Sequence, residues 1–178
     1  MNNIIKLNKI LKIKPERTLG MGFRDRIARA TVTSVAPTHF ITLSLCQAIK
    51  INQCRNGVVW IKGDDIIYGK THLGFIRSLS KRLCSESSWR YHKPLLRSAC
   101  VIEGGSNGER NHMHLIIAKP KHVDEDTFRV MVLRTADGNP WVMNGAHCVD
   151  IQSINGTMEA VNAAFYNVKR GVERLTFS

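Results

Sequence analysis

Apolar and polar residues alternate along several short stretches of the chain, which is the pattern of half-buried β-strands. Residues 38–46, THFITLSLC, alternate in this way and are rich in β-branched and aromatic residues, and residues 149–154 also read as a strand. Residues 58–67 predict another strand or a hairpin. Within residues 98–119 the dipeptide Asn107-Gly108, which favours two-residue type I′ turns, lies between two runs of this kind. The pattern therefore predicts several strands, two of which form a tight hairpin.

Apolar residues that recur every three or four positions predict helices between these strands. We expect one helix from Thr71, as its N-cap, to about Cys84, and a second from Asp124 to about Thr135 with acidic residues in its first turn. Strands mixed with helices predict an α+β fold, in which an antiparallel sheet carries helices on one face and leaves the other face open for a ligand. Thr157 is expected to cap a last helix, whose packing stripe consists of Met158, Val161, Phe165, Val168 and Val172.

The chain carries 26 Lys and Arg residues against 14 Asp and Glu residues, a formal net charge of +12. This charge favours a polyanionic partner such as nucleic acid or an acidic membrane surface. Residues 1–35 hold eight of the basic residues and two of the acidic ones, so half of the net charge lies there. We therefore expect a basic N-terminal arm, residues 1–36, followed by one folded domain, residues 37–178.

The arm itself contains apolar residues at helical spacing. Ile4, Leu7 and Leu11 predict a short amphipathic helix before Pro15, which would pack on the domain, lie along DNA or contact a membrane surface. The first residues, MNNIIKLNKILKIK, have charges among the apolar side chains, unlike a secretory signal. No apolar run in the sequence approaches the roughly 18 to 20 residues that cross a bilayer. These features predict an intracellular protein.

The Asn107-Gly108 turn fixes the register of the predicted hairpin. With these two residues at the tip, Glu103 lies directly opposite His112, and His114 follows on the same face. One carboxylate and two imidazoles at cross-strand distance are suited to a divalent metal ion. A solvated polar face is the alternative, and it is less favoured for the three residues together than for any one of them. The other face of the hairpin is apolar and consists of Cys100, Ile102, Met113, Leu115 and Ile117.

Tyr166 lies outside the packing stripe of the last helix. A second line of residues follows the flank of this helix and consists of Asn162, Tyr166, Lys169 and Glu173. An ammonium group one turn from a phenol can stabilise a phenolate or neutralise a phosphate, as a tyrosine that attacks a phosphodiester requires. A simple packing role for Tyr166 is the alternative interpretation.

Three motifs follow one another along the chain: the strand Phe40-Ile41-Thr42-Leu43, the His-hydrophobic-His motif His112-Met113-His114, and the Tyr-x-x-Lys motif Tyr166-Asn167-Val168-Lys169. On these motifs, which span residues 38–170, the chain resembles the HUH endonuclease superfamily and specifically its single-tyrosine rolling-circle replication initiators. The resemblance implies that residues 37–178 form a catalytic domain. Its core would be a five-stranded antiparallel sheet similar to RNA-recognition-motif or ferredoxin-like domains.

The resemblance also implies the chemistry of the site. Glu103, His112 and His114 would hold Mg²⁺ or Mn²⁺, and Tyr166 would attack a phosphodiester of single-stranded DNA, leaving a free 3′-hydroxyl and a 5′-phosphotyrosine link. Lys169 would steady the charge beside the tyrosine. The implied partners are single-stranded or origin-hairpin DNA and a separately encoded host helicase, with no membrane partner. The implied location is the cytoplasm of the host cell.

Further residues are expected to contact DNA, because aromatic residues among basic ones suit unpaired bases. The leading candidate surface is residues 89–93, WRYHK. Arg170 stands where two-tyrosine initiators carry their second tyrosine, so one nucleophile is expected per chain. Burial in the core is favoured for the tryptophans Trp60, Trp89 and Trp141. The predicted DNA contacts are Arg77, Lys81, Arg90, Tyr91, Lys93, Arg110, Asn162 and Arg170.

Three other functions are compatible with the sequence. The first is a single-tyrosine transposase of the same superfamily. The second is a non-catalytic nucleic-acid-binding module with a similar sheet, which would not explain the Tyr166-x-x-Lys169 motif or the metal residues. The third is a non-haem iron oxygenase, which also uses two histidines and a carboxylate but often has an all-β scaffold.

Overall fold

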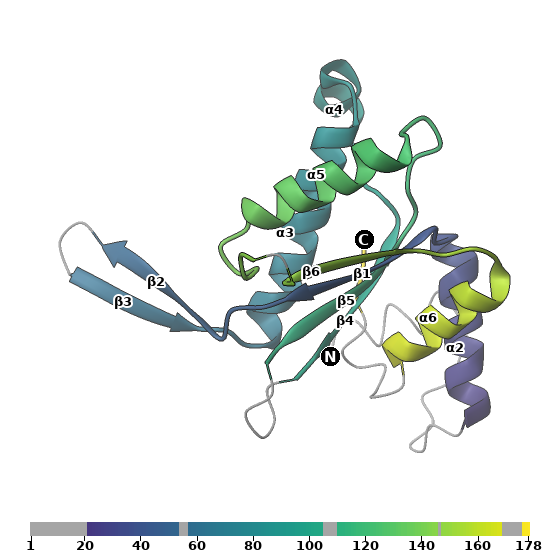
Figure 1. The fold of residues 1–178 in the computed structure, drawn as a ribbon, viewed down its shortest axis with the longest axis horizontal. Helices are drawn as coiled ribbons and strands as arrows, with labels where there is room; N and C mark the ends of the chain where they lie inside the picture. The colour runs from purple at the N-terminus through teal and green to yellow at the C-terminus, as the bar shows by residue number, and fades with distance from the viewer. Residues whose placement is uncertain (1–20, 54–56, 105–109, 146, 169–175) are drawn as a thin grey trace.

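The computed structural model describes residues 21–53, 57–104, 110–145, 147–168 and 176–178 (Figure 1). Helices and strands are interspersed along these residues. In chain order the elements are α2 (Met21–Val35), β1 (His39–Ser44), β2 (Ala48–Gln53), β3 (Gly57–Lys62), α3 (Asp65–Leu83), α4 (Glu86–His92), β4 (Ser98–Glu103), β5 (His112–Ile117), α5 (Glu125–Asp137), β6 (Val149–Ser153), α6 (Thr157–Val168) and β7 (Thr176–Phe177).

The main sheet has five strands in the order β6-β1-β5-β4-β7, and every neighbouring pair is antiparallel. Helix α3 comes between β1 and β4 in the sequence, and α5 comes between β5 and β6. Each of these connections passes over one strand, since β5 lies between β1 and β4, and β1 lies between β5 and β6. Two interlocked units of this kind make the split β-α-β arrangement of ferredoxin-like domains. The predicted α+β class with a five-stranded antiparallel sheet is confirmed.

The hairpin of β4 and β5 has the register that the sequence predicts, with Glu103 opposite His112. Gly104 follows with a φ of 98°, a left-handed conformation, and a Cβ atom there would lie 2.2 Å from the carbonyl oxygen of Arg110. A glycine is therefore required directly after Glu103. The predicted turn at Asn107-Gly108 lies outside the described residues.

Helices α3 and α5 pack on one face of the sheet, which we call the core face. Alternate residues of β1, β4 and β5 supply its side chains, and they include the whole apolar set predicted for the hairpin. Helix α5 begins after Asp124, whose side chain accepts a hydrogen bond from the Thr127 amide, as the acidic start of this segment predicts. The core includes Ile41, Leu43, Cys100, Ile102, Met113, Leu115 and Ile117 of the sheet, Phe75, Ile76 and Leu79 of α3, and Phe128 and Val132 of α5.

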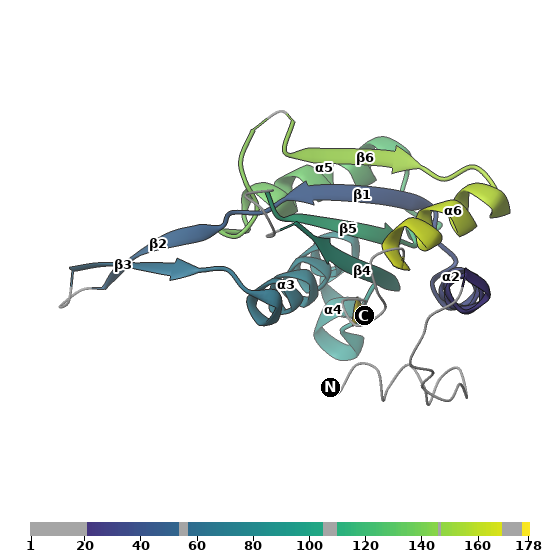
Figure 2. The same cartoon turned by 90° about the horizontal axis from the view of Figure 1, so that it is seen from below.

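Helices α2 and α6 lie on the opposite face, which we call the site face, near one end of the sheet (Figure 2). They pack on each other, and Ile27, Ala28 and Ala164 are buried together with Ala99 and Ile116 of the sheet. The sequence pattern predicts helices on one face only, so the structure differs in covering part of the second face. Helix α2 is formed by residues that the charge pattern assigns to the basic arm.

The N-terminal part of the predicted arm, residues 1–20 with the amphipathic helix, lies outside the described residues. The start of α3 differs from the prediction. Asp64 is the N-cap and accepts a hydrogen bond from the Ile67 amide, whereas Thr71 lies inside the helix and donates to the Ile67 carbonyl. The earlier start brings Tyr68 into the core. Two candidate caps about two helical turns apart make this boundary hard to predict.

The packing face of α6 also differs from the prediction. Thr157 is the first helical residue, and the Gly156 carbonyl accepts the hydrogen bond of the Ala160 amide. Met158, predicted to pack, is 69% exposed, while Val161 is buried as expected. The buried face is completed by the small residues Ala160 and Ala164. Small residues allow α6 to approach α2 closely.

Two buried histidines connect elements on the core face. His72 of α3 is hydrogen-bonded through Nε2 to the Ser98 hydroxyl of β4 and through Nδ1 to the Thr176 hydroxyl of β7, both at 2.9 Å. Burial lowers the pKa of His72 to about 4, so the ring is neutral at neutral pH. His72 thereby attaches the edge strand β7 to the body of the domain.

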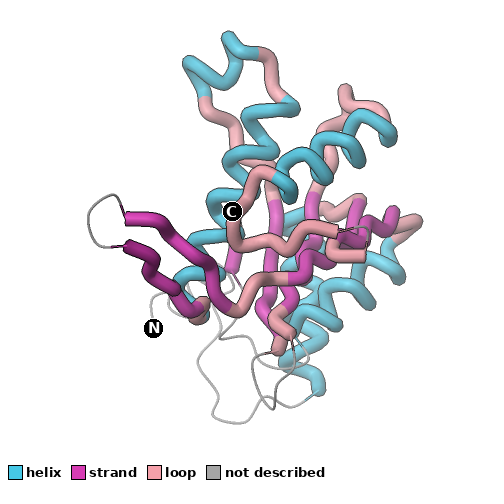
Figure 3. The backbone as a smooth tube through the Cα atoms, turned by 60° about the vertical axis from the view of Figure 1, so that its left-hand side comes forward, coloured by secondary structure: helices cyan, strands magenta, loops and turns pink. Residues whose placement is uncertain are grey.

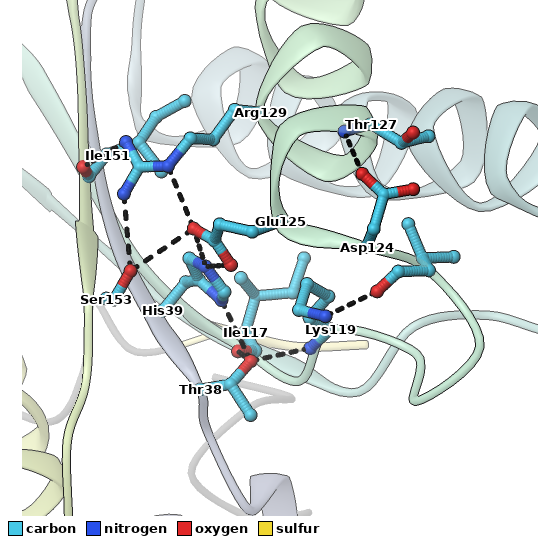
Figure 4. Close-up of polar contacts among 11 residues, drawn as sticks. Thr38, His39, Ile117, Lys119, Asp124, Glu125, Thr127, Arg129, Ile151 and Ser153 are labelled. Atoms are coloured by element: carbon cyan, nitrogen blue, oxygen red, sulfur yellow. Dashed lines mark hydrogen bonds and ion pairs between the residues drawn. The ribbon is translucent and has the colours of Figure 1, made fainter.

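His39 of β1 contacts the start of α5 (Figure 4). Its Nε2 lies 2.9 Å from the Glu125 carboxylate, and Glu125 also accepts hydrogen bonds from Arg129 and from Ser153 of β6. Arg129 reaches the Ile151 carbonyl as well. The hydrogen bond from His39, together with that from Arg129, lowers the pKa of Glu125 to about 2. This network fixes α5 across β1 and β6.

Strands β2 and β3 form a separate two-stranded hairpin that projects from the end of the sheet where β1 ends (Figure 3). The prediction of a strand or hairpin in residues 58–67 is therefore correct for β3, and its partner β2 lies just upstream in the sequence.

Candidate functional site

Strand alternation brings polar residues of neighbouring strands together on the site face. Thr42 and Ser44 of β1 lie between residues of the buried core, and they are paired across the sheet with His114 and His112 of β5. Glu103 of β4 is paired with His112 on its other side. Residues paired in an antiparallel sheet project from the same face, so these five side chains form one group.

The centre of this group is the carboxylate of Glu103. Its Oε2 accepts a hydrogen bond from the Tyr166 hydroxyl at 3.2 Å and lies 3.4 Å from Nε2 of His114. Glu103 and His114 are each 7% exposed, whereas Tyr166 is 37% exposed. The phenol of α6 therefore reaches from the surface to a partly desolvated acid and imidazole of the sheet.

Aromatic contacts hold the Tyr166 ring in this position. It meets the His114 ring edge-on with centroids 5.1 Å apart, and the Phe40 ring edge-on at 5.9 Å. Phe40 in turn stacks on His114 at 5.7 Å. Edge-to-face packing of this kind adds to burial energy and restrains the ring. The orientation of Tyr166 is thus fixed by β1 and β5 together.

Hydroxyl groups of β1 orient both imidazoles. The Thr42 hydroxyl is hydrogen-bonded to Nδ1 of His114 at 3.0 Å, and the Ser44 hydroxyl to Nδ1 of His112 at 3.4 Å. Metal-binding histidines commonly have one ring nitrogen held in this way, which leaves the other nitrogen for the ion. The sequence marks Thr42 only as part of a motif strand, and Ser44 is not among the predicted site residues.

The donor set only partly fits a divalent ion as the side chains lie here. Glu103 and His114 face each other, but the centroids of the His112 and His114 rings are 6.2 Å apart. Among the described residues, no group of three or more His, Cys, Asp or Glu side chains is gathered closely enough to hold a metal ion. The structure brings together Glu103 and His114, and a Mg²⁺ or Mn²⁺ site that includes His112 stays a prediction.

A pocket of 470 Å³ opens beside Tyr166. Its described lining contains no Lys or Arg residue, and Glu159 contributes a carboxylate. Carboxamides and aromatic rings suit a flat, polar and uncharged group more than a phosphate. The pocket is lined by Phe40, Gln152, Ser153, Ile154, Asn155, Glu159, Asn162, Ala163 and Tyr166.

The predicted DNA contacts are distributed over both faces. Asn162 lines the pocket beside Tyr166, and Arg110 is exposed just before β5. Lys169 and Arg170 lie outside the described residues. The remaining five belong to α3, which packs on the core face, and to the short helix α4 next to it (Figure 2), with Lys93 as the C-cap of α4. They are therefore not brought to the site: Arg77, Lys81, Arg90, Tyr91 and Lys93.

One further carboxylate lies on the site face, and no sequence motif marks it. Asp150 of β6 is paired with Thr42 of β1 and accepts a hydrogen bond from the Gln152 side chain at 2.7 Å. Alternation within residues 149–154 would have predicted its face once β6 was known to neighbour β1. That neighbourhood depends on contacts between distant parts of the chain.

Comparison of the chain with protein-family models, with curated protein sequences and with solved structures finds no match. Within the described residues, no helix is both long and apolar enough to cross a membrane. The function therefore has to be argued from the residues of the site.

Proposed function

We propose that this protein is a metal-dependent endonuclease and strand transferase of the HUH type, which nicks and rejoins single-stranded DNA through Tyr166. The observation that carries the proposal is the contact of the Tyr166 hydroxyl and of His114 with the same carboxylate oxygen of Glu103. A nucleophile next to a carboxylate and an imidazole on one sheet face is an arrangement suited to phosphodiester transfer. The net charge of +12 favours a DNA substrate.

Tyr166 is the best placed of the three tyrosines in the chain. Tyr68 is buried beneath the hairpin base, and burial raises the pKa of its phenol. Tyr91 is exposed on α4, the short helix next to α3 (Figure 2), and is not part of the polar group on the site face. Only Tyr166 joins the polar group on the site face, which supports one nucleophile per chain.

In the proposed reaction, the phenol oxygen of Tyr166 forms a bond to phosphorus while the bond from phosphorus to the 3′-oxygen breaks. Glu103 accepts the hydrogen bond of the phenol, holds its oxygen over the site and is placed to take the proton that the phenol loses. The 3′-oxygen leaves as a hydroxyl after it gains a proton, and the 5′-phosphate remains on the tyrosine. Reversal of these steps joins DNA ends.

Glu103, His114 and, after a small movement of its ring, His112 would hold Mg²⁺ or Mn²⁺. A bound ion would supply Lewis-acid polarisation of the phosphate oxygens. Thr42 and Ser44 would keep both imidazoles oriented by their hydrogen bonds to Nδ1. The pocket beside Tyr166 offers space for the base next to the cleaved bond, because its carboxamides can read base edges and its aromatic rings can stack.

The test is the formation of a covalent protein–DNA adduct. The protein is incubated with Mn²⁺ and a pool of end-labelled single-stranded oligonucleotides, and SDS-stable adducts are resolved by electrophoresis. We expect an adduct with the natural sequence and a loss on the order of 10³-fold or more with Tyr166→Phe. Tyr91→Phe, which removes the same hydroxyl from the far layer, is the matched control and should keep the adduct.

Two results would contradict the proposal. An undiminished adduct with Tyr166→Phe would place the nucleophile elsewhere, and binding without any adduct would favour a non-catalytic nucleic-acid-binding module. If adducts form, sequencing the cleaved ends separates a replication initiator, which acts at one origin sequence, from a transposase, which acts at both ends of an element.

A further inference from the structure

The β2–β3 hairpin has two different faces. Cross-strand pairing places Lys50 opposite Trp60 and Ala48 opposite Lys62, so these four side chains project from one face. The opposite face carries Ile49, Ile51, Val59 and Ile61. Three of these isoleucines line a 370 Å³ groove against α3 and Trp141, so the apolar face turns toward the body of the domain. The face with Lys50, Trp60 and Lys62 therefore turns away from it.

Trp60 is the most unusual residue of the outer face. Its side chain is 67% exposed, although burial is expected for tryptophan, and Lys50 and Lys62 are exposed on the same face. The sequences of β2 and β3, AIKINQ and GVVWIK, contain no acidic residue. The indole ring of Trp60 thus has Lys50 as its cross-strand neighbour and Lys62 two residues along its own strand, and neither strand contains a carboxylate.

The base of the hairpin is anchored to the domain. The Tyr68 hydroxyl donates to the Cys46 carbonyl and accepts a hydrogen bond from the Asn111 side chain. Gly63, at the end of β3, permits this approach, since a Cβ atom there would lie 2.1 Å from the Tyr68 oxygen. The Gly63 amide is also hydrogen-bonded to the Gln47 carbonyl. The outer face is therefore presented in a defined direction.

We propose that the outer face of the β2–β3 hairpin binds single-stranded nucleic acid, with a base stacked on Trp60 and phosphates contacted by Lys50 and Lys62. This combination of an exposed aromatic ring with flanking cations is how single strands are held without reading their sequence. The site is separate from Tyr166 and does not depend on the proposed cleavage reaction.

Charge and composition favour this occupant over two others. A second copy of the chain would bring Lys50 and Lys62 against the same cations, and each chain carries +12. A membrane surface is usually recruited by clusters of four to eight basic residues, more than this face provides. Duplex DNA keeps its bases stacked, so Trp60 would have no base to cover. A single strand offers unpaired bases to stack on Trp60 and phosphates to contact Lys50 and Lys62.

The hairpin leaves the sheet at the end where β1 finishes and β5 begins, which is the end that carries His112 and Glu103 (Figure 1). A single strand bound on Trp60 would thus approach the domain from the side of the candidate site. A strand that first binds on the hairpin can therefore continue toward Tyr166.

The test measures binding without cleavage. The full chain with Tyr166→Phe is titrated in EDTA against a fluorescent oligothymidine of 20 nucleotides, and anisotropy gives the Kd. We expect Trp60→Ala to weaken binding roughly 5- to 100-fold and Trp60→Phe, which keeps a ring, to restore most of it. Combining Lys50→Gln with Lys62→Gln should lower the slope of log K against log salt concentration by about 1.4. Val59→Ala, on the opposite face of the same strand, should bind as the parent chain does.

Several outcomes would overturn the proposal. They are no binding of the oligonucleotide by the parent chain, an unchanged Kd for Trp60→Ala, or an equal loss with Val59→Ala, which would indicate a general effect on the hairpin. Preference for duplex DNA, tighter binding to vesicles with 30% anionic lipid, or dimerisation lost with Trp60→Ala would assign the face to another partner. The two proposals are distinguishable, because an unchanged Kd for Trp60→Ala leaves the cleavage proposal untouched and failure of the adduct assay leaves this one untouched.

Discussion

A pair of histidines on the core face, His39 and His72, can be compared with the pair on the site face, His112 and His114, because the partners of their ring nitrogens differ. On the core face, His39 and His72 each have both nitrogens hydrogen-bonded to side chains of the protein. On the site face, His112 and His114 use Nδ1 for a hydroxyl of β1, and Nε2 of His114 faces the Glu103 carboxylate beside Tyr166. Histidine therefore connects secondary-structure elements on the core face, whereas on the site face His114 is oriented toward Glu103 and Tyr166.

The hydrogen-bond partners of a buried histidine help to distinguish a structural role from a role in a candidate active site. Burial alone does not distinguish them, since His39, His72 and His114 all have small exposed fractions. Their hydrogen-bond partners distinguish them. His39 links β1 to α5, and His72 links α3 to both β4 and β7, whereas His114 contacts Glu103 and the ring of Tyr166, the candidate nucleophile. Substitution should therefore affect stability on one face and DNA cleavage on the other.

The largest expected effect is that of His114→Gln on cleavage. The amide can still pair with Thr42, but it cannot replace an imidazole toward a metal ion, so adduct formation should fall by on the order of 10²-fold or more. The free energy of unfolding should change by about 1 kcal/mol or less. Electrophoresis of adducts and urea unfolding give the two numbers. Cleavage at the parent rate would remove His114 from the site.

On the core face, His72→Ala should destabilise the protein by about 2–4 kcal/mol, because it leaves a cavity and deprives the Ser98 and Thr176 hydroxyls of a partner. Urea unfolding followed by circular dichroism measures this loss. Adduct formation at a temperature where the variant is folded should be retained. A variant as stable as the parent would show that β7 is held by other contacts.

The pH dependence of stability should also report His72. Its pKa is about 4 in the folded protein and close to the usual 6.5 in the unfolded chain, so between these values the unfolded state binds the extra proton. Stability should be complete above pH 6.5 and fall by up to roughly 3 kcal/mol as the pH decreases to 4. His72→Gln should flatten this dependence in urea unfolding measured between pH 7.5 and 4.5. An identical slope in both proteins would contradict the assignment.

Smaller effects are expected from hydroxyl groups next to the histidines. Thr42→Val removes the partner of His114 Nδ1 and should reduce adduct formation about 10-fold, with a corresponding loss of Mn²⁺ affinity. Thr38→Val removes the matching hydroxyl from His39 on the core face. It should change the unfolding midpoint and leave the adduct rate as it was. If Thr42→Val and Thr38→Val change the adduct rate and the unfolding midpoint by similar amounts, the hydroxyl groups on the two faces do not have different roles.

The smallest effect is expected from Glu125. Its pKa of about 2 in the folded protein lies below the usual value near 4.5, so its contribution is present above pH 4.5 and is lost as the pH falls toward 2. The side chain is 42% exposed, and solvent screening limits the contribution to about 1 kcal/mol or less. Acid unfolding of Glu125→Gln, compared with the parent chain, checks this value. A loss of several kcal/mol would contradict it.

The features that the sequence predicts correctly are those set by neighbouring residues. The Asn107-Gly108 turn signal, together with alternation in β4 and β5, was sufficient to predict the register of Glu103 and His112. Helical spacing was sufficient to put Tyr166 on an exposed flank of α6. Both depend on backbone geometry over a few residues.

The features that escaped prediction depend on contacts between distant segments. Ser44 and Asp150 join the site face only because β1 lies between β5 and β6. Arg77 and Arg90 look like DNA contacts in the sequence, but α3 packs on the core face and carries that layer away from Tyr166. Trp60 is exposed because its hairpin stands apart from the sheet. No local pattern encodes which layer a helix will join.

The phenol of Tyr68 has a mechanical consequence. Through its hydrogen bonds with the Cys46 carbonyl and the Asn111 amide, it ties the root of the β2–β3 hairpin to the residue that immediately precedes His112. A strand of nucleic acid that pulled on the hairpin would therefore load the start of β5 instead of bending a loose connection. The hairpin is thus mechanically coupled to the strand that carries His112 and His114.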